Sequence, residues 1–238
     1  MFDFQVETPI LNTPYDEPKA HWRIVEGEEP RVVEERRRAS YFYRPVRAST
    51  TDEENEDIGT EIELLMVNRI RERVRQWRES GYPGATKISL ELLAWWRREG
   101  RAQKLFFAQI EAAETVIFLT EGRSDLRQGI QVELDEPADG QRAEGIKALK
   151  RYACKMATGS GKTTVMGMLA AWSILNKVAS GGRDARYSDF VLIVAPNVTI
   201  RSRLGELVPA RGEGSLYRTR DLVPPHLMLQ LADRKSVV

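Results

Sequence analysis

The sequence has one cysteine, Cys154, and therefore cannot form an internal disulfide bond. This scarcity of cysteine favours a reducing compartment, and we expect the protein to be cytoplasmic. The sequence also lacks an apolar run of the roughly 20 residues needed to cross a bilayer. Its start, Met1 to Phe4, contains an acid and no basic segment, so a secretory signal is not expected either.

Net charge is nearly absent, because 36 basic and 35 acidic residues leave a formal charge of +1. A bulk attraction to nucleic acid is thereby excluded, and any DNA contact must come from a local basic surface. The 238 residues are 42% hydrophobic and 30% charged, which is typical of a soluble globular protein of one large or two small domains.

Helical periodicity is missing from the first 60 residues, which are rich in Pro, Asp, Glu and Arg. We expect short extended pieces and loops there, with a solvated linker over 50–57. Further along, apolar residues recur at helical spacing and predict helices over 61–78 and 103–119. Between these, a helix is expected to begin at Ser89 as its N-cap and to end at Gly100.

The middle of the chain predicts a βαβ unit. Residues 149–156 alternate as a strand does, residues 162–177 have the pattern of a helix, and FVLIVAP (190–196) is a β-branched run typical of buried parallel strands. The first strand and the helix are joined by ATGSGKT, residues 157–163. The order of strand, loop, helix and strand indicates a parallel sheet with flanking helices.

The joining segment ends in the Gly-Lys-Thr of a phosphate-binding loop, although the usual first glycine falls on Met156. Gly159 and Gly161 would let consecutive N–H groups turn inward around a triphosphate, beside the partial positive charge of a helix N-terminus. Lys162 is expected to act as the catalytic residue that reaches the β- and γ-phosphates. The Thr163 hydroxyl would ligate Mg²⁺, and Thr158 and Ser160 complete the nucleotide-binding segment.

The form ATGSGKT, preceded by Met and followed by an apolar helix, resembles the first motif of superfamily-two helicases and translocases. LFFAQIEAAETVIFLTE (105–121) looks like the upstream segment of that superfamily, which implies that Gln109 reads the adenine edge. An ordinary surface-helix glutamine is the alternative. VLIVAPNVTIRSRL (191–204) is similar to a motif whose helix start contacts nucleic acid, through Pro196, Asn197 and Arg201 here. A plain helix start is the alternative for those three residues.

More narrowly, the chain resembles the restriction subunit of type III restriction enzymes. The resemblance is carried, in order, by YDEPKAHWRI, RVRQWRESGYPGATKISLELLAWW, LFFAQIEAAETVIFLTE, KMATGSGKT and APNVTIRSRLGEL. It implies ATP-driven translocation on double-stranded DNA, with ATP and Mg²⁺ as cofactors and a modification methyltransferase subunit as a partner. The implied fold is α/β, with an incomplete RecA-like lobe over 104–238 after a mixed α and irregular region over 1–103.

A motor of this kind needs an apolar strand ending in Asp-Glu downstream of the loop, and a second RecA-like lobe with its arginine. Neither is present, since Asp52-Glu53-Glu54 and Asp135-Glu136 precede the loop and are interpreted as solvated loop acids. We therefore expect the chain alone to bind ATP and to turn it over far more slowly than about 1 s⁻¹. A downstream polypeptide is expected to complete the motor.

Two other functions stay open. The chain could be a truncated, non-catalytic module for nucleotide binding or interaction, or the product of a decaying gene. It could also be a different P-loop NTPase, such as a kinase or a partitioning ATPase. The segments on either side of the loop disfavour this last alternative, because they match the superfamily-two motifs in order.

Overall fold

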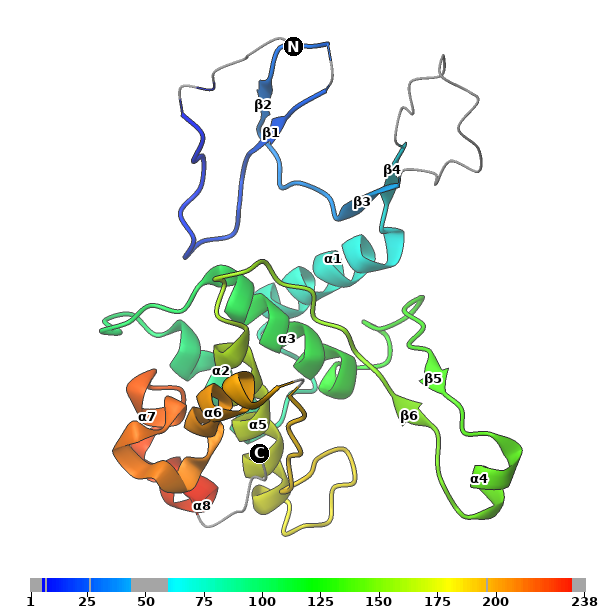
Figure 1. Ribbon diagram of the computed structural model, residues 1–238, viewed down its shortest axis with the longest axis vertical. Helices are drawn as coiled ribbons and strands as arrows, with labels where there is room; N and C mark the ends of the chain where they lie inside the picture. The colour runs from blue at the N-terminus through cyan, green and yellow to red at the C-terminus, as the bar shows by residue number, and fades with distance from the viewer. Residues whose placement is uncertain (1–5, 7, 26, 44–59, 196, 233–238) are drawn as a thin grey trace. The chain divides into compact units, whose positions relative to one another are not determined.

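The computed structural model describes residue 6 and residues 8–25, 27–43, 60–195 and 197–232 (Figure 1). The chain divides into an N-terminal unit, residues 1–73, and a C-terminal unit, residues 74–238. The division falls within helix α1 (Leu65–Glu79), earlier in the chain than the boundary expected at residue 103. The predicted phosphate-binding loop, residues 157–163, and the helix that follows it therefore lie in the C-terminal unit.

The N-terminal unit contains two small antiparallel ribbons. Strand β1 (His21–Arg23) pairs with β2 (Arg31–Val33), and β3 (Ser40–Tyr43) pairs with β4 (Thr60–Glu63). These strands confirm the short extended pieces predicted here. The helix predicted over 61–78 is corrected at its start, because Thr60 and Ile62 alternate with two glutamates and pair with β3 before α1 begins.

The C-terminal unit is mainly helical. Helix α2 (Lys87–Arg97) begins at Thr86 and not at Ser89, because the Thr86 hydroxyl accepts the hydrogen bond from the Ser89 amide at 3.0 Å. Helix α3 (Phe107–Glu121) buries Ile110, Ala113 and Ile117, as its apolar stripe predicts. Helix α5 (Lys162–Ala179) also confirms the prediction, and none of the described helices combines the length and apolarity needed to cross a membrane.

Helix α5 lies at the centre of this unit and contacts α2, α3 and the segment 205–232 (Figure 1). That segment consists of short helices that pack closely against Gly167 of α5. A Cβ added to Gly167 would lie 3.0 Å from Leu216 and 3.1 Å from Leu222. The remaining elements are β5 (Leu134–Asp135), α4 (Asp139–Ala143), β6 (Leu149–Lys150), α6 (Val198–Leu204), η1 (Gly205–Leu207), η2 (Pro209–Gly214), α7 (Leu216–Thr219), η3 (Pro225–Leu227) and α8 (Met228–Ala232).

The predicted parallel sheet is not found among the described residues, where each sheet is a two-stranded antiparallel pair. The strand expected over 149–156 is limited to β6, and residues 190–195 contain a single β-bridge residue, Leu192. A buried parallel strand needs neighbours on both edges and cover on both faces. Phe190, Leu192 and Val194 are instead 53%, 65% and 83% exposed, so the described residues do not form the predicted βαβ unit.

A buried polar cluster fixes α5 against α2 and α3. The Glu121 carboxylate, 5% exposed at the end of α3, accepts hydrogen bonds from Ser89 at 2.6 Å, Trp172 at 2.7 Å and Tyr187 at 2.8 Å. Its second oxygen accepts from the Thr86 amide at 2.8 Å. Burial, and then the neighbouring Glu121 carboxylate, raise the pKa of Tyr187 above its ordinary value, so this phenol stays a donor.

Candidate functional site

The segment 157–163 forms a tight turn that leads directly into α5. Gly159 and Gly161 have φ angles of +81° and +80°, a region that side-chain-bearing residues rarely adopt. Gly161 is the N-cap of α5, and Lys162 is its first residue. The turn is closed by the Ser160 hydroxyl, which donates to the Ala157 carbonyl at 2.7 Å.

The N-terminus of α5 presents the groups that an anion would use. The Lys162 ammonium is exposed and donates to the Ala157 carbonyl at 2.9 Å. An anion bound there would replace this carbonyl as the acceptor for the ammonium. The first amides of a helix have no partner within the helix and carry its positive end of the dipole. Thr163 is half-buried in this first turn, Ser160 is half-buried and Thr158 is exposed.

Gln109 lies beside this loop. Its side chain is only 6% exposed, and its Oε1 accepts from the Phe106 amide at 3.0 Å as a cap of α3. Its Nε2 donates to the Ser160 carbonyl at 3.0 Å, and a Cβ added to Gly161 would lie 2.1 Å from this nitrogen. Gln109 is therefore not an ordinary surface glutamine, because it joins the start of α3 to the loop.

The helix start predicted to contact nucleic acid is α6. The Asn197 side chain accepts from the Ile200 amide at 2.9 Å and is the N-cap, which is the role that a plain helix start requires. Arg201 is exposed in the same helix, and Pro196 lies outside the described residues. Asn197 thus has a structural role, and the exposed cations of this helix are Arg201 and Arg203.

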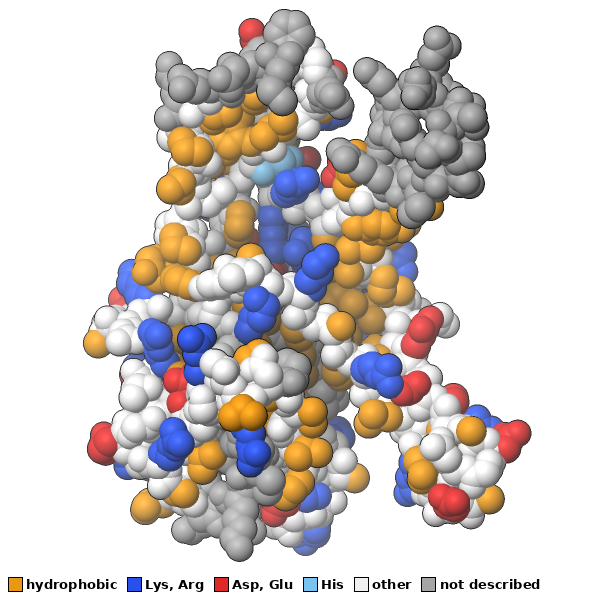
Figure 2. Space-filling view, viewed as in Figure 1, with side chains coloured by type: hydrophobic (Ala, Val, Ile, Leu, Met, Phe, Trp, Pro, Cys, Tyr) orange, Lys and Arg blue, Asp and Glu red, His pale blue; other side chains and the backbone are white. Residues whose placement is uncertain are grey.

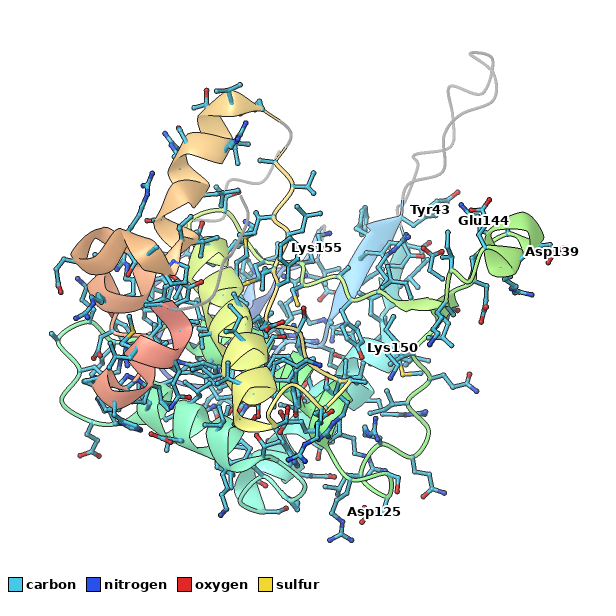
Figure 3. The ribbon with its side chains drawn as sticks, turned by 90° about the horizontal axis from the view of Figure 1, so that it is seen from below. Tyr43, Asp125, Asp139, Glu144, Lys150 and Lys155 are labelled. Atoms are coloured by element: carbon cyan, nitrogen blue, oxygen red, sulfur yellow. The ribbon has the colours of Figure 1, made fainter. Side chains whose placement is uncertain are left out.

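The acidic residues before the loop form surface ion pairs. Asp135 is exposed and pairs with Arg151, and Glu136 accepts from Arg142 at 3.3 Å, which confirms that both are solvated acids. Asp139 and Glu144 project outward at the two ends of α4 (Figure 3). Asp52-Glu53-Glu54 lies outside the described residues. Within the described ranges, no group of three His, Cys, Asp or Glu side chains could hold a metal ion.

Two features of the site were not predicted from the sequence. The Lys162 ammonium is held by the Ala157 carbonyl, and Gln109 is held by the Ser160 carbonyl. Both partners are backbone groups, which no residue pattern reveals.

Glu121 was missed as the centre of the polar cluster, although an acid that ends a strongly apolar helix was a visible signal of a buried polar role.

Comparison of this chain with protein-family models, with curated proteins and with solved structures gave no match. The features of this chain that indicate a function are therefore the loop, its contacts and the order of the motifs in the sequence.

Proposed function

We propose that the chain binds Mg-ATP at residues 157–163 and acts as the N-terminal part of a DNA-dependent ATPase, similar to the restriction subunit of type III restriction enzymes. One observation carries this proposal. Two glycines with positive φ lead into α5 with Lys162 as its first residue, and the buried Gln109 contacts the same turn. Such a turn at a helix N-terminus supports phosphate binding.

The residues at the loop fit the phosphates of a nucleotide. The Lys162 ammonium would pair with the β- and γ-phosphates, and the first amides of α5 would donate to their oxygens. Thr163 would supply one hydroxyl ligand to Mg²⁺, which commonly keeps several waters and is held largely by substrate phosphates. When bound, the metal would neutralise phosphate charge.

Gln109 would recognise the adenine edge. A carboxamide carries one donor group and one acceptor group, which match the donor and acceptor of adenine. At present its Oε1 caps α3 and its Nε2 holds Ser160. Adenine binding would therefore replace at least one of these two hydrogen bonds of the Gln109 side chain. The same side chain would then contact both the loop and the base.

The wider architecture that we propose is a RecA-like lobe completed by a further polypeptide or a downstream segment. The support is the exposure of Phe190, Leu192 and Val194, which belong to a continuous apolar run that suits a strand with neighbours. In the complete motor, the start of α6 would face double-stranded DNA. The residues that would contact the DNA are Pro196, Asn197 and Arg201. A methyltransferase subunit would supply site recognition.

Substitution of Lys162 tests the nucleotide site. Lys162→Ala is expected to weaken ATP binding at least about ten-fold, because one charged hydrogen bond to a phosphate contributes about 1.5–3 kcal/mol. Isothermal titration with ATP and Mg²⁺ measures this change. Lys150→Ala is the matched control, since Lys150 is an exposed lysine of the same unit outside the loop (Figure 3), and its affinity should stay at the wild-type value. Equal affinities for both variants would refute the site.

A nucleotide-binding interaction module without turnover is the second candidate. It is favoured by the exposed apolar run at 190–194, which suits contact with another chain as well as completion of a sheet. Double-stranded DNA distinguishes the two candidates. The motor predicts that DNA changes the ATP affinity of the assembled protein, whereas a simple module predicts no coupling between the two ligands.

A further inference from the structure

The carbonyl oxygen of Ala157 is the acceptor on which the loop closes. The Ser160 hydroxyl donates to it at 2.7 Å, the Lys162 ammonium at 2.9 Å and the Ser160 amide at 3.3 Å. A carbonyl oxygen has two lone pairs, so these three donors saturate it. An ammonium, a hydroxyl and a backbone amide that converge on one oxygen are also groups that bind a phosphate oxygen. The loop thus pairs with itself the donors that a phosphate would use.

Ser160 holds this closed loop from both sides. Its amide and its hydroxyl donate to Ala157, and its carbonyl accepts from the buried Gln109 at 3.0 Å. The bond from the hydroxyl to a carbonyl three residues earlier is a local contact of the kind by which serine stabilises turns. The hydrogen-bonding capacity of this hydroxyl is therefore used within the loop itself.

A phosphate would compete with the Ala157 carbonyl for the same donors. The Lys162 ammonium is charged, and a charged phosphate oxygen is a stronger acceptor for it than a neutral carbonyl. A ligand without phosphate offers no such gain. The Ala157 carbonyl is therefore expected to keep ligands without phosphate away from these donors.

We propose that the Ala157 carbonyl is an internal competitor of the phosphates, which keeps the loop closed until a polyphosphate displaces it. The Ser160 hydroxyl stabilises the closed loop instead of binding the phosphates. This inference rests on the proposed function, since it takes the triphosphate of ATP as the ligand of the loop. It gives Ser160 and Lys162 opposite roles. Lys162 increases the affinity for the nucleotide, whereas the Ser160 hydroxyl lowers it and so favours polyphosphates over weaker ligands.

Carbonyl NMR of the full chain reads this closure directly. The sequence has two Ala-Thr pairs, Ala85-Thr86 and Ala157-Thr158, so a chain made with ¹³C-carbonyl alanine and ¹⁵N-threonine gives two resonances in a spectrum that correlates the two labels. A carbonyl carbon resonance moves upfield when hydrogen bonds to its oxygen are lost. In the chain without nucleotide, Ser160→Ala and Lys162→Ala should each move the Ala157 resonance upfield, and the Ala85 resonance should stay in place.

Addition of Mg-ATP should also move the wild-type Ala157 resonance upfield, because the donors leave the carbonyl for the phosphates. Adenosine, which lacks phosphates, should leave it in place. The C-terminal unit carries further exposed Lys and Arg side chains, which are spread over the face seen in Figure 2 and would attract a polyanion weakly. The Ala157 resonance distinguishes such surface binding from binding at the loop.

Isothermal titration with Mg-ATP tests the role of the Ser160 hydroxyl. Ser160→Ala should bind about two- to ten-fold more tightly than the wild type, which is the change expected from one net hydrogen bond of the closed loop. Ser180→Ala is the matched control. The half-buried Ser180 also donates its hydroxyl to the carbonyl three residues earlier, that of Lys177 at 2.8 Å, but at the other end of α5. Its ATP affinity should stay at the wild-type value.

The outcomes separate the closure from the nucleotide site. If either Ser160→Ala or Lys162→Ala leaves the Ala157 resonance in place without nucleotide, the closure is overturned whether or not ATP binds. Unchanged or weaker ATP binding by Ser160→Ala would overturn the role of the hydroxyl. Heat of ATP binding without a shift of the Ala157 resonance would overturn the competition and leave the nucleotide site standing. The absence of both heat and shift would overturn the nucleotide site and the competition with it.

Discussion

Replacement of Glu114 by alanine is expected to lower the free energy of unfolding by about 3–5 kcal/mol, the loss typical when one partner of a buried ion pair is removed. The Glu114 carboxylate is fully buried in α3 and accepts from Arg78 at 2.8 Å and from Arg97 at 2.8 Å. The Tyr82 hydroxyl donates to it at 2.7 Å. Without Glu114, two partly buried guanidinium groups, 16% and 30% exposed, and a half-buried phenol lose their shared acceptor.

Urea unfolding followed by circular dichroism measures this loss. Burial, and then the Glu114 carboxylate, raise the pKa of Tyr82 above its ordinary value, so the phenol remains a donor throughout the neutral range. Glu79→Ala is the matched control, because Glu79 is exposed and follows Arg78 directly. It should change stability by less than about 0.5 kcal/mol. A loss below about 1 kcal/mol for Glu114→Ala would contradict the buried cluster.

Gly161→Ala is expected to have the second-largest effect, a loss of about 2–4 kcal/mol in stability together with loss of ATP binding. The left-handed conformation of Gly161 costs a side-chain-bearing residue about 1–2 kcal/mol. The new Cβ would also lie 2.1 Å from the Gln109 Nε2, so the buried glutamine must move. Its hydrogen bonds to Phe106 and Ser160 would then be lost, at about 1 kcal/mol each.

Two controls separate these causes. Gly159→Ala has the same positive φ but no described atom within 4 Å of the added Cβ, so it should cost only the backbone term of about 1–2 kcal/mol. In the double variant Gln109→Ala/Gly161→Ala the clash is gone, and the stability loss should be clearly smaller than the sum of the two single losses. Additivity within about 0.5 kcal/mol would show that Gln109 does not contact Gly161.

Helices α3 and α5 of the C-terminal unit were predictable because their information is local, whereas the short helices over 205–232 were not predicted. In α3, residues Ile110, Ala113 and Ile117 recur at helical spacing, and all three are buried. Helix α5 begins at Lys162, immediately after the glycine that its loop requires. The glycines of the loop were predictable for the same reason, since positive φ at Gly159 and Gly161 follows from residue type.

Features that depend on distant or backbone partners were not predictable. The run FVLIVAP has the composition of a buried strand, yet strand formation requires a neighbouring strand, which the residues themselves do not supply. Thr86 and Ser89 are both residue types that favour the N-cap, and Thr86 is the N-cap of α2 in the structure. The burial of Gln109 depends on its approach to Ser160, which lies far along the chain.

Photoaffinity labelling with 8-azido-ATP tests whether a nucleotide binds at residues 157–163 beside Gln109, because the reagent reacts from the adenine ring and marks the residues around it. We expect a label in the tryptic peptide 105–123, which contains Gln109. The label should be suppressed by excess ATP and lost in Lys162→Ala, which removes the phosphate contact without touching the labelled peptide. A label within the N-terminal unit, or one that persists in Lys162→Ala, would contradict a nucleotide site at this loop.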